Sequence, residues 1–156
     1  MDYTNNDEFI EEVSRCVLHL NSLEEDQNRI PVNIVISQAI HESDWGRSRF
    51  ATIGNNLLGI RTFDPADNQM KPLNLPNVAW GLRIFETKCE SISYYMYLLN
   101  NNHHYESFRE ERFLQYISDI MDLNKLIRTL AIYAEDVYYT QKITQTLKQL
   151  EAYDRD

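Results

Sequence analysis

The segment 31–45, PVNIVISQAIHESDW, constrains the fold more than any other because it combines helical periodicity with apolar residues on almost all sides. Pro31 suits the first turn of a helix. One broad apolar stripe consists of Val32, Val35, Ile36, Ala39 and Ile40, and Ile34 and Trp45 make the opposite side partly apolar. A helix of this kind is buried among other elements. The pattern therefore predicts a central helix in a chain whose 156 residues suffice for one hydrophobic core.

A glutamate lies near the end of this predicted helix. At about 100° per residue, Gln38, Glu42 and Trp45 fall in one row beside the main apolar stripe. A carboxylate next to apolar side chains loses hydration, which raises its pKa and favours the protonated form. Such a group can act as the general acid of glycoside hydrolysis. The alternative interpretation is structural: Glu42 pairs with Arg47 or Arg49, or caps the turn.

The remaining apolar periodicity is mostly helical. It predicts helices over 7–20, from Thr87 onward, and over 113–121, 123–134 and 137–150. Thr87 and Glu90 form a T-x-x-E capping box, and Asp122 and Asp136 are the expected N-caps of the last two helices.

Two strand-like segments interrupt the helices. Gly46 ends the predicted central helix, and the glycines and asparagines of 54–59 suit a tight turn. Residues 57–63 and 78–85 have strand patterns, and the intervening 64–77 is a polar loop rich in proline, asparagine and aspartate. The predicted fold class is α+β, mostly α, with a small β-hairpin lobe.

The net charge of −9 is concentrated at the N-terminus, where residues 1–28 hold eight acidic residues and one basic residue. We assign 1–28 to an acidic N-terminal helix and loop that belongs to a single domain with residues 29–156. The remainder is nearly neutral and lacks the broad basic face of a phosphate-backbone binder, so a nucleic acid partner is disfavoured.

The sequence shows neither the apolar segment of a membrane span nor the pattern of a secretory signal peptide. No apolar run approaches the ~18 residues of a membrane span. The N-terminus, MDYTNNDEFIEE, is acidic and polar where a secretory signal would be basic and then apolar. We therefore expect no membrane span and see no signal peptide in this chain.

The cysteines and histidines do not form a metal-binding pattern. Cys16 and Cys89 lie in separate predicted helices, and we expect both to be small buried residues, although one bridge between them is open. His41 and Glu42 are adjacent in HESDW, which is not HExxH, and the histidines 103–104 lie in a polar stretch. We expect no metal and no cofactor.

Three segments resemble one family in the same order. The stretch 38–60, QAIHESDWGRSRFATIGNNLLGI, is similar to Q-A-x-x-E-S-x-W-G-x-S-R-F-A followed by G-N-N-L-x-G-I in Bax-like bacterial glucosaminidases. The stretch 82–105, LRIFETKCESISYYMYLLNNNHHY, resembles that group's R-x-[FY]-x-[ST]-x-x-x-S-[IV]-x-x-Y-x-x-x-L-N segment. The stretch 133–143, YAEDVYYTQKI, is similar to its Y-A-T-D-x-x-Y-x-x-K-[IL] ending. The group belongs to glycoside hydrolase family 73 of the lysozyme superfamily.

This resemblance implies a lysozyme-like helical domain with a cleft between helices and a small β lobe. It implies a peptidoglycan hydrolase that cleaves the glycan strand, as an endo-β-N-acetylglucosaminidase, with Glu42 as general acid. The expected partner is the glycan strand, the expected location is the bacterial cell envelope, and we favour a monomer.

Other site residues follow from the same motifs. Tyr139 matches one of two tyrosines in the terminal motif and is the expected catalytic or sugar-binding tyrosine. Tyr133 matches the other and is expected to bind substrate, with a place in the core as its alternative. Asn55 and Asn56 match the turn, where their amides could bind an acetamido group or simply form the turn. Gln38 and Tyr95 also match motif positions, and we expect them to contact the substrate.

The second catalytic group stays open. It is either a carboxylate of the β lobe, for which Asp64 and Asp67 are available, or the substrate's own acetamido group. Asp44, Leu58 and Glu135 depart from the family pattern, which has glycine, phenylalanine and threonine there. A non-catalytic lysozyme-like module that binds glycan or protein is the main alternative, and a muramidase or a lytic transglycosylase is a further one.

Overall fold

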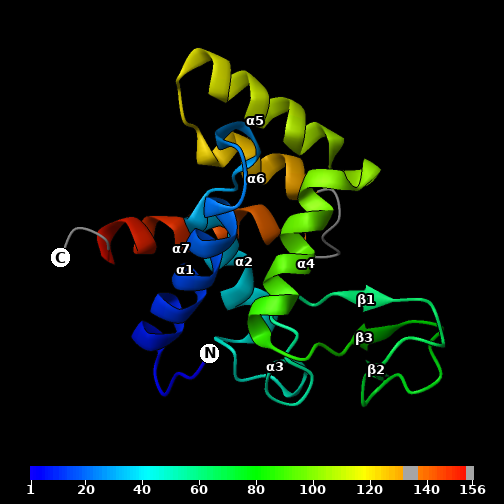
Figure 1. Ribbon diagram of the computed structural model, residues 1–156. Helices are drawn as coiled ribbons and strands as arrows, with labels where there is room; N and C mark the ends of the chain where they lie inside the picture. The colour runs from blue at the N-terminus through cyan, green and yellow to red at the C-terminus, as the bar shows by residue number, and fades with distance from the viewer. Residues whose placement is uncertain (132–136, 154–156) are drawn as a thin grey trace.

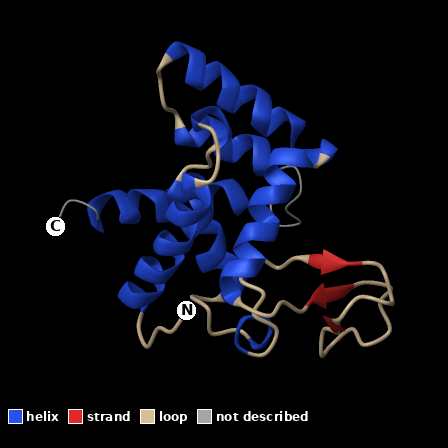
Figure 2. Cartoon of the chain, in the orientation of Figure 1, coloured by secondary structure: helices blue, strands red, loops and turns tan. Residues whose placement is uncertain are grey.

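The computed structural model describes residues 1–131 and 137–153 of the chain. The elements are α1 (Asn6–Ser22), η1 (Asp26–Asn28), α2 (Val32–Ser43), α3 (Arg49–Thr52), β1 (Arg61–Thr62), β2 (Gln69–Met70), β3 (Gly81–Arg83), α4 (Lys88–Asn101), η2 (His103–Tyr105), α5 (Glu106–Ser118), α6 (Leu123–Leu130) and α7 (Tyr139–Tyr153). The helices gather around α2, and the short strands lie to one side of them (Figures 1 and 2). The predicted α+β, mostly helical fold class is confirmed.

The predicted central helix is α2. Its buried residues are Ile34, Val35, Ile36, Ser37, Gln38, Ala39, Ile40 and Ser43. It packs against α1 on one side and α7 on another. Phe9, Val13 and Val17 of α1 are fully buried in the same core, so the acidic N-terminal helix hides one apolar face and exposes its charged face.

The end of α2 differs from the prediction, which carried the helix to Trp45. The helix ends at Ser43, and the next three residues, Asp44, Trp45 and Gly46, all have positive φ. The Ser43 hydroxyl donates to Ala39 and accepts from the Gly46 N–H, which satisfies polar groups at the helix end. Asp44 is left-handed at the position where the family pattern has glycine, and aspartate tolerates that conformation.

The β lobe contains one strand more than predicted. β1 and β3 pair antiparallel as expected, with Arg61 opposite Leu82, but β2 lies within the segment predicted as a loop and pairs with the other edge of β3. The sheet order is β1-β3-β2. Gln69 and Met70 form only a two-residue strand, which is too short to leave an alternating pattern in the sequence.

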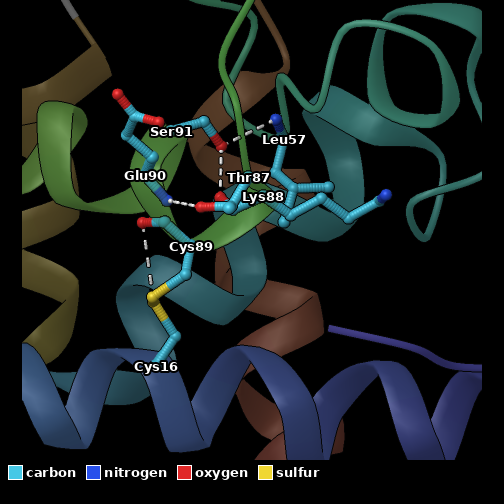
Figure 3. The surroundings of a disulfide bond; sticks show 7 residues. All are labelled: Cys16, Leu57, Thr87, Lys88, Cys89, Glu90 and Ser91. Atoms are coloured by element: carbon cyan, nitrogen blue, oxygen red, sulfur yellow. Dashed lines mark hydrogen bonds between the residues drawn. A yellow bond between two sulfur atoms is a disulfide. The ribbon is translucent and has the colours of Figure 1, made fainter.

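A disulfide joins α1 to α4, where we had expected two buried free thiols. Cys16 and Cys89 are bridged, with their Cα atoms 5.8 Å apart (Figure 3). The predicted N-cap of α4 is confirmed, since the Thr87 hydroxyl accepts from the Glu90 N–H. The Ser91 hydroxyl, in the first turns of α4, accepts from the Leu57 N–H. The start of α4 therefore also fixes the position of the chain just before β1.

The last helices keep the predicted order with shifted boundaries. α5 begins earlier than predicted, and Asp119, with φ 56°, ends it. Asp122 is the predicted N-cap of α6, and its side chain accepts from the Lys125 N–H. The predicted cap Asp136 lies outside the described residues. Among the described helices, none has the length and apolar character needed to cross a membrane.

Candidate active site

A cleft of about 610 Å³ lies between the helices and the β lobe. α2 and the chain leading into β1 contribute some of the lining residues, and α4, η2 with the residue before it, the end of α6 and the start of α7 contribute the others. Its lining residues are Gln38, Glu42, Leu58, Gly59, Ile60, Arg61, Tyr94, Tyr95, Leu98, Asn102, Tyr105, Leu130 and Tyr139. Four of the sequence-predicted site residues therefore meet in one cavity: Gln38, Glu42, Tyr95 and Tyr139.

Glu42 is the next-to-last residue of α2 and the one carboxylate among the described residues that line the cleft. The Glu42 side chain is exposed to solvent through the open cleft, but protein atoms crowd around its carboxylate and remove part of its hydration. The resulting loss of hydration raises the pKa of Glu42, and the nearby positive charge of Arg61 lowers that pKa by a smaller effect. The raised pKa means that Glu42 keeps its proton to a higher pH than a fully hydrated glutamate does.

Arg61 is a cleft residue for which the sequence analysis predicted no role. Its guanidinium carbon lies 3.9 Å from the centre of the Trp80 ring, so the cation is stacked on the indole. Arg61 is the first residue of β1, and Trp80 directly precedes β3. These two strands pair with each other in the sheet. The sequence contains a hint of this role, because Arg61 directly follows the G-N-N-L-x-G-I turn motif. How near Arg61 lies to Glu42, however, depends on the fold.

Two tyrosines and a glutamine form a hydrogen-bonded chain at the wall of the cleft. The Tyr95 hydroxyl donates to Gln38 Oε1 at 2.6 Å, and Gln38 Nε2 donates to the Tyr139 hydroxyl at 2.9 Å. Burial, with a smaller contribution from the negative charge of Glu42, raises the pKa of both phenols well above the usual value. Both tyrosines are therefore neutral at physiological pH.

The two asparagines of the turn lie outside the cleft lining, and their amides are occupied. Asn56 is buried and donates to the carbonyls of Ile60 and Arg83, while its oxygen accepts from the Ile60 N–H. The Asn55 amide donates to the carbonyls of Phe85 and Glu86 and accepts from Lys88. Of the two interpretations, this geometry favours turn formation; sugar binding by either amide stays a prediction.

The predicted β-lobe carboxylates also lie outside the cleft lining. Asp67 accepts from the Thr62 hydroxyl at 2.6 Å, and Asp64 accepts from the Ala66 N–H at 2.9 Å. Both side chains therefore stabilise the bend between β1 and β2. Tyr133, predicted to bind substrate, lies outside the described residues.

No group of three or more metal-ligating side chains occurs within residues 1–131 and 137–153. His41 Nε2 is 2.7 Å from the Thr146 hydroxyl, which ties α2 to α7. The rings of His103 and His104 lie against each other with centroids 4.0 Å apart. His41, His103 and His104 therefore make contacts with protein side chains that fit a structural role.

Known proteins resemble this chain in both sequence and fold. The family model for glucosaminidase, described as mannosyl-glycoprotein endo-beta-N-acetylglucosaminidase, matches residues 20–152. Protein bax of Escherichia coli is 35% identical over 92 residues, which cover 59% of this chain and 32% of that protein. The match thus spans about a third of the relative's length.

Solved structures share the fold at low sequence identity. The catalytic domain of the autolysin Auto from Listeria monocytogenes has a TM-score of 0.69 at 18% identity, over 100% of this chain and 91% of that one. The glycoside hydrolase domain of Salmonella typhimurium FlgJ has a TM-score of 0.66 at 20% identity, over 97% of this chain and 92% of that one. With the family model matching most of its length, this chain belongs to the glucosaminidase family of glycoside hydrolases.

Proposed function

We propose that this protein is a peptidoglycan hydrolase, an endo-β-N-acetylglucosaminidase in which Glu42 is the general acid. Family membership supports the reaction class. The observation that carries the proposal is the position of Glu42, a carboxyl with a raised pKa in the cleft between helices and β lobe. A protonated carboxyl there can give its proton to the glycosidic oxygen as the bond to the anomeric carbon breaks.

We further propose that the 2-acetamido group of the substrate supplies the nucleophile. Support comes from the cleft lining, which contains no carboxylate besides Glu42 among the described residues. In this mechanism the acetamido carbonyl oxygen bonds to the anomeric carbon while the glycosidic oxygen leaves with the proton from Glu42. Water then attacks the same carbon, the bond from that carbon to the acetamido oxygen breaks and restores the acetamido group, and Glu42, now a carboxylate, takes the proton from that water.

Asp64 as second catalytic carboxylate is the competing version of the mechanism. It requires the β1–β2 bend to move, because the Asp64 carboxylate accepts a backbone hydrogen bond within that bend. Asp64→Asn separates the two versions. Activity close to that of wild type supports the acetamido route, and a loss comparable to that of Glu42→Gln supports the carboxylate.

The Cys16–Cys89 disulfide supports a location outside the cytoplasm, where peptidoglycan is found. Disulfides persist in oxidising compartments such as the bacterial periplasm and the cell exterior. We therefore propose that the protein acts in the cell envelope.

The test is digestion of purified peptidoglycan by wild type and Glu42→Gln. Asp44→Asn is the matched control, because it removes a carboxylate two residues away that does not line the cleft. We expect Glu42→Gln to fold normally and to lose at least about 10²-fold in turnover. We expect Asp44→Asn to retain activity, because asparagine also tolerates the left-handed conformation of residue 44.

The new sugar ends, identified by reduction and mass spectrometry, define the reaction. Reducible N-acetylglucosamine ends produced by wild type support the proposal. Reducible muramic acid ends would identify a muramidase, and anhydro ends a lytic transglycosylase. Glycan binding without cleavage by any variant would refute the enzyme and support a binding module.

A further inference from the structure

Gln38, Tyr95 and Tyr139 come from three different helices and meet through two hydrogen bonds. The Tyr95 hydroxyl of α4 lies 2.6 Å from Gln38 Oε1 of α2, and Gln38 Nε2 lies 2.9 Å from the Tyr139 hydroxyl at the start of α7. Gln38 is 4% exposed and Tyr95 is 6% exposed, so water competes little with either bond. Gln38 and Tyr95 are predicted from the sequence to contact the substrate, but their polar groups are directed at each other.

The direction of the hydrogen bonds follows from counting donors. A glutamine amide can be turned round, so that its nitrogen faces Tyr95 and its oxygen faces Tyr139. In that orientation the buried Tyr95 hydroxyl would accept from the amide, and its own proton would have no acceptor among the described residues. Leaving a buried donor unpaired is unfavourable. The orientation in which Tyr95 donates to Gln38 is therefore the stable one.

This direction decides what Tyr139 can do. Its oxygen accepts from the Gln38 amide, and within the described residues its own proton is donated to no group. Tyr139 lines the cleft together with Glu42, and the two side chains are close enough for the Glu42 carboxyl to influence the pKa of the phenol. The proton of Tyr139 is thus available to an acceptor that enters the cleft.

We propose that Gln38 and Tyr95 are positioning residues that hold the Tyr139 hydroxyl as a hydrogen-bond donor toward the substrate. The acceptor is an oxygen atom of the sugar bound beside Glu42. The role of the Tyr139–sugar hydrogen bond in turnover rests on the proposed function. The direction of the two hydrogen bonds among Tyr95, Gln38 and Tyr139 does not. The bond orients the sugar that receives the proton from Glu42, so its loss lowers kcat more than it raises KM.

Gln38→Glu tests this arrangement with almost no change in shape. A carboxylate can only accept hydrogen bonds, so it takes the proton of Tyr139 as well as that of Tyr95, and the donor toward the substrate is lost. Gln38→Glu should therefore lower kcat by about as much as Tyr139→Phe, roughly 10- to 100-fold. The double variant should be no slower than either single variant, because all three lose the same bond.

Lowering the pH should reverse the effect of Gln38→Glu but not that of Tyr139→Phe. Burial raises the pKa of the introduced carboxyl, and once protonated it can donate to Tyr139 as the amide does. A structural defect would not recover in this way. Gln115→Glu is the matched control, since Gln115 is a buried glutamine on α5 that lies outside the cleft. It can lower stability but should leave kcat and its pH dependence unchanged.

Tyrosine ring NMR with a ¹³Cζ label gives a readout that does not depend on activity. In Gln38→Glu the Cζ resonance of Tyr139 should shift at neutral pH, because the hydroxyl changes from acceptor to donor toward residue 38. As the pH is lowered, the Cζ resonance of Tyr139 should return toward its wild-type position in a single titration step. The midpoint of that step should equal the midpoint at which kcat of Gln38→Glu recovers. Above the pH at which the introduced carboxyl ionises, an unchanged Tyr139 resonance, or equal kcat values for wild type and Gln38→Glu, would overturn the proposal. A shifted resonance in a protein that cleaves no glycan would uphold the bond direction and refute the proposed function instead.

Discussion

The backbone of Gly59 lies against the carboxylate of Glu42, and a Cβ atom at Gly59 would stand 2.8 Å from Glu42 Oε2. Gly59 also has a φ of +66°, a conformation that other residues rarely adopt. The glycine therefore has two roles: it permits the turn into β1, and it leaves space for the carboxylate in the cleft.

Replacing Gly59 by alanine should displace the Glu42 carboxylate, because the end of a flexible side chain moves more easily than the backbone. We expect kcat/KM on peptidoglycan to fall at least about 10-fold, and the free energy of unfolding to fall by about 1–2 kcal/mol from the positive φ. Asp119→Ala, at a φ of 56° away from the cleft, is the control for that conformational cost. Equal activity of the two variants would contradict the role of Gly59.

Removing the positive charge of Arg61 should shift the pH profile toward the alkaline side. Arg61 lowers the pKa of Glu42, so Arg61→Gln raises that pKa, and the protonated acid persists to higher pH. The descending limb of kcat/KM against pH should move up in the variant. Arg61→Lys keeps the charge and should keep the limb near its wild-type position. A descending limb that moves to lower pH in Arg61→Gln would show that the titration of a group other than Glu42 controls this limb.

Replacing Asn56 by alanine should destabilise the β lobe rather than weaken sugar binding. The change leaves two carbonyls and one N–H without their bonds to the side chain, so we expect a loss of about 2–4 kcal/mol in urea unfolding. The KM measured well below the unfolding transition should stay unchanged. Asn101→Ala, at an exposed asparagine, should cost less than about 0.5 kcal/mol. A raised KM with unaltered stability would favour sugar contact by Asn56.

Reduction of the disulfide should lower the free energy of unfolding by about 4 kcal/mol, because the bridge joins residues 73 positions apart and restricts the unfolded chain. The measurement is urea unfolding with and without dithiothreitol. The double variant Cys16→Ser, Cys89→Ser should be equally destabilised and should not respond to the reductant. A change below about 1 kcal/mol on reduction would indicate that the bridge does not restrict the unfolded chain as calculated.

Participation of the acetamido group predicts a retained anomeric configuration. Two displacements at the same carbon restore the β configuration, so proton NMR of freshly formed product should show the β anomer first. An α anomer at the earliest times would require direct attack by water on the opposite face, and thus a base that the acetamido route does not include.

Local patterns in the sequence predicted most of the helices and the acid. The apolar periodicity of 31–45 identified α2, and helical geometry put Glu42 at the border of its apolar stripe. The caps Thr87 and Asp122 were also predicted, because capping depends on residues only three positions apart. These features are local, since each depends on neighbours within about one helical turn.

The tertiary structure decided which distant residues meet. The Cys16–Cys89 bridge, the stacking of Arg61 on Trp80 and the bond from Gln38 to Tyr139 join positions from 19 to 101 residues apart. Such pairs depend on how helices and strands pack, which periodicity does not specify. The sequence alone determined that this chain has a buried helix ending in an acid. The way in which α2, α4, α7 and the start of β1 meet around one cleft determined that the acid faces that cleft, with Arg61 beside it and an oriented tyrosine in its wall.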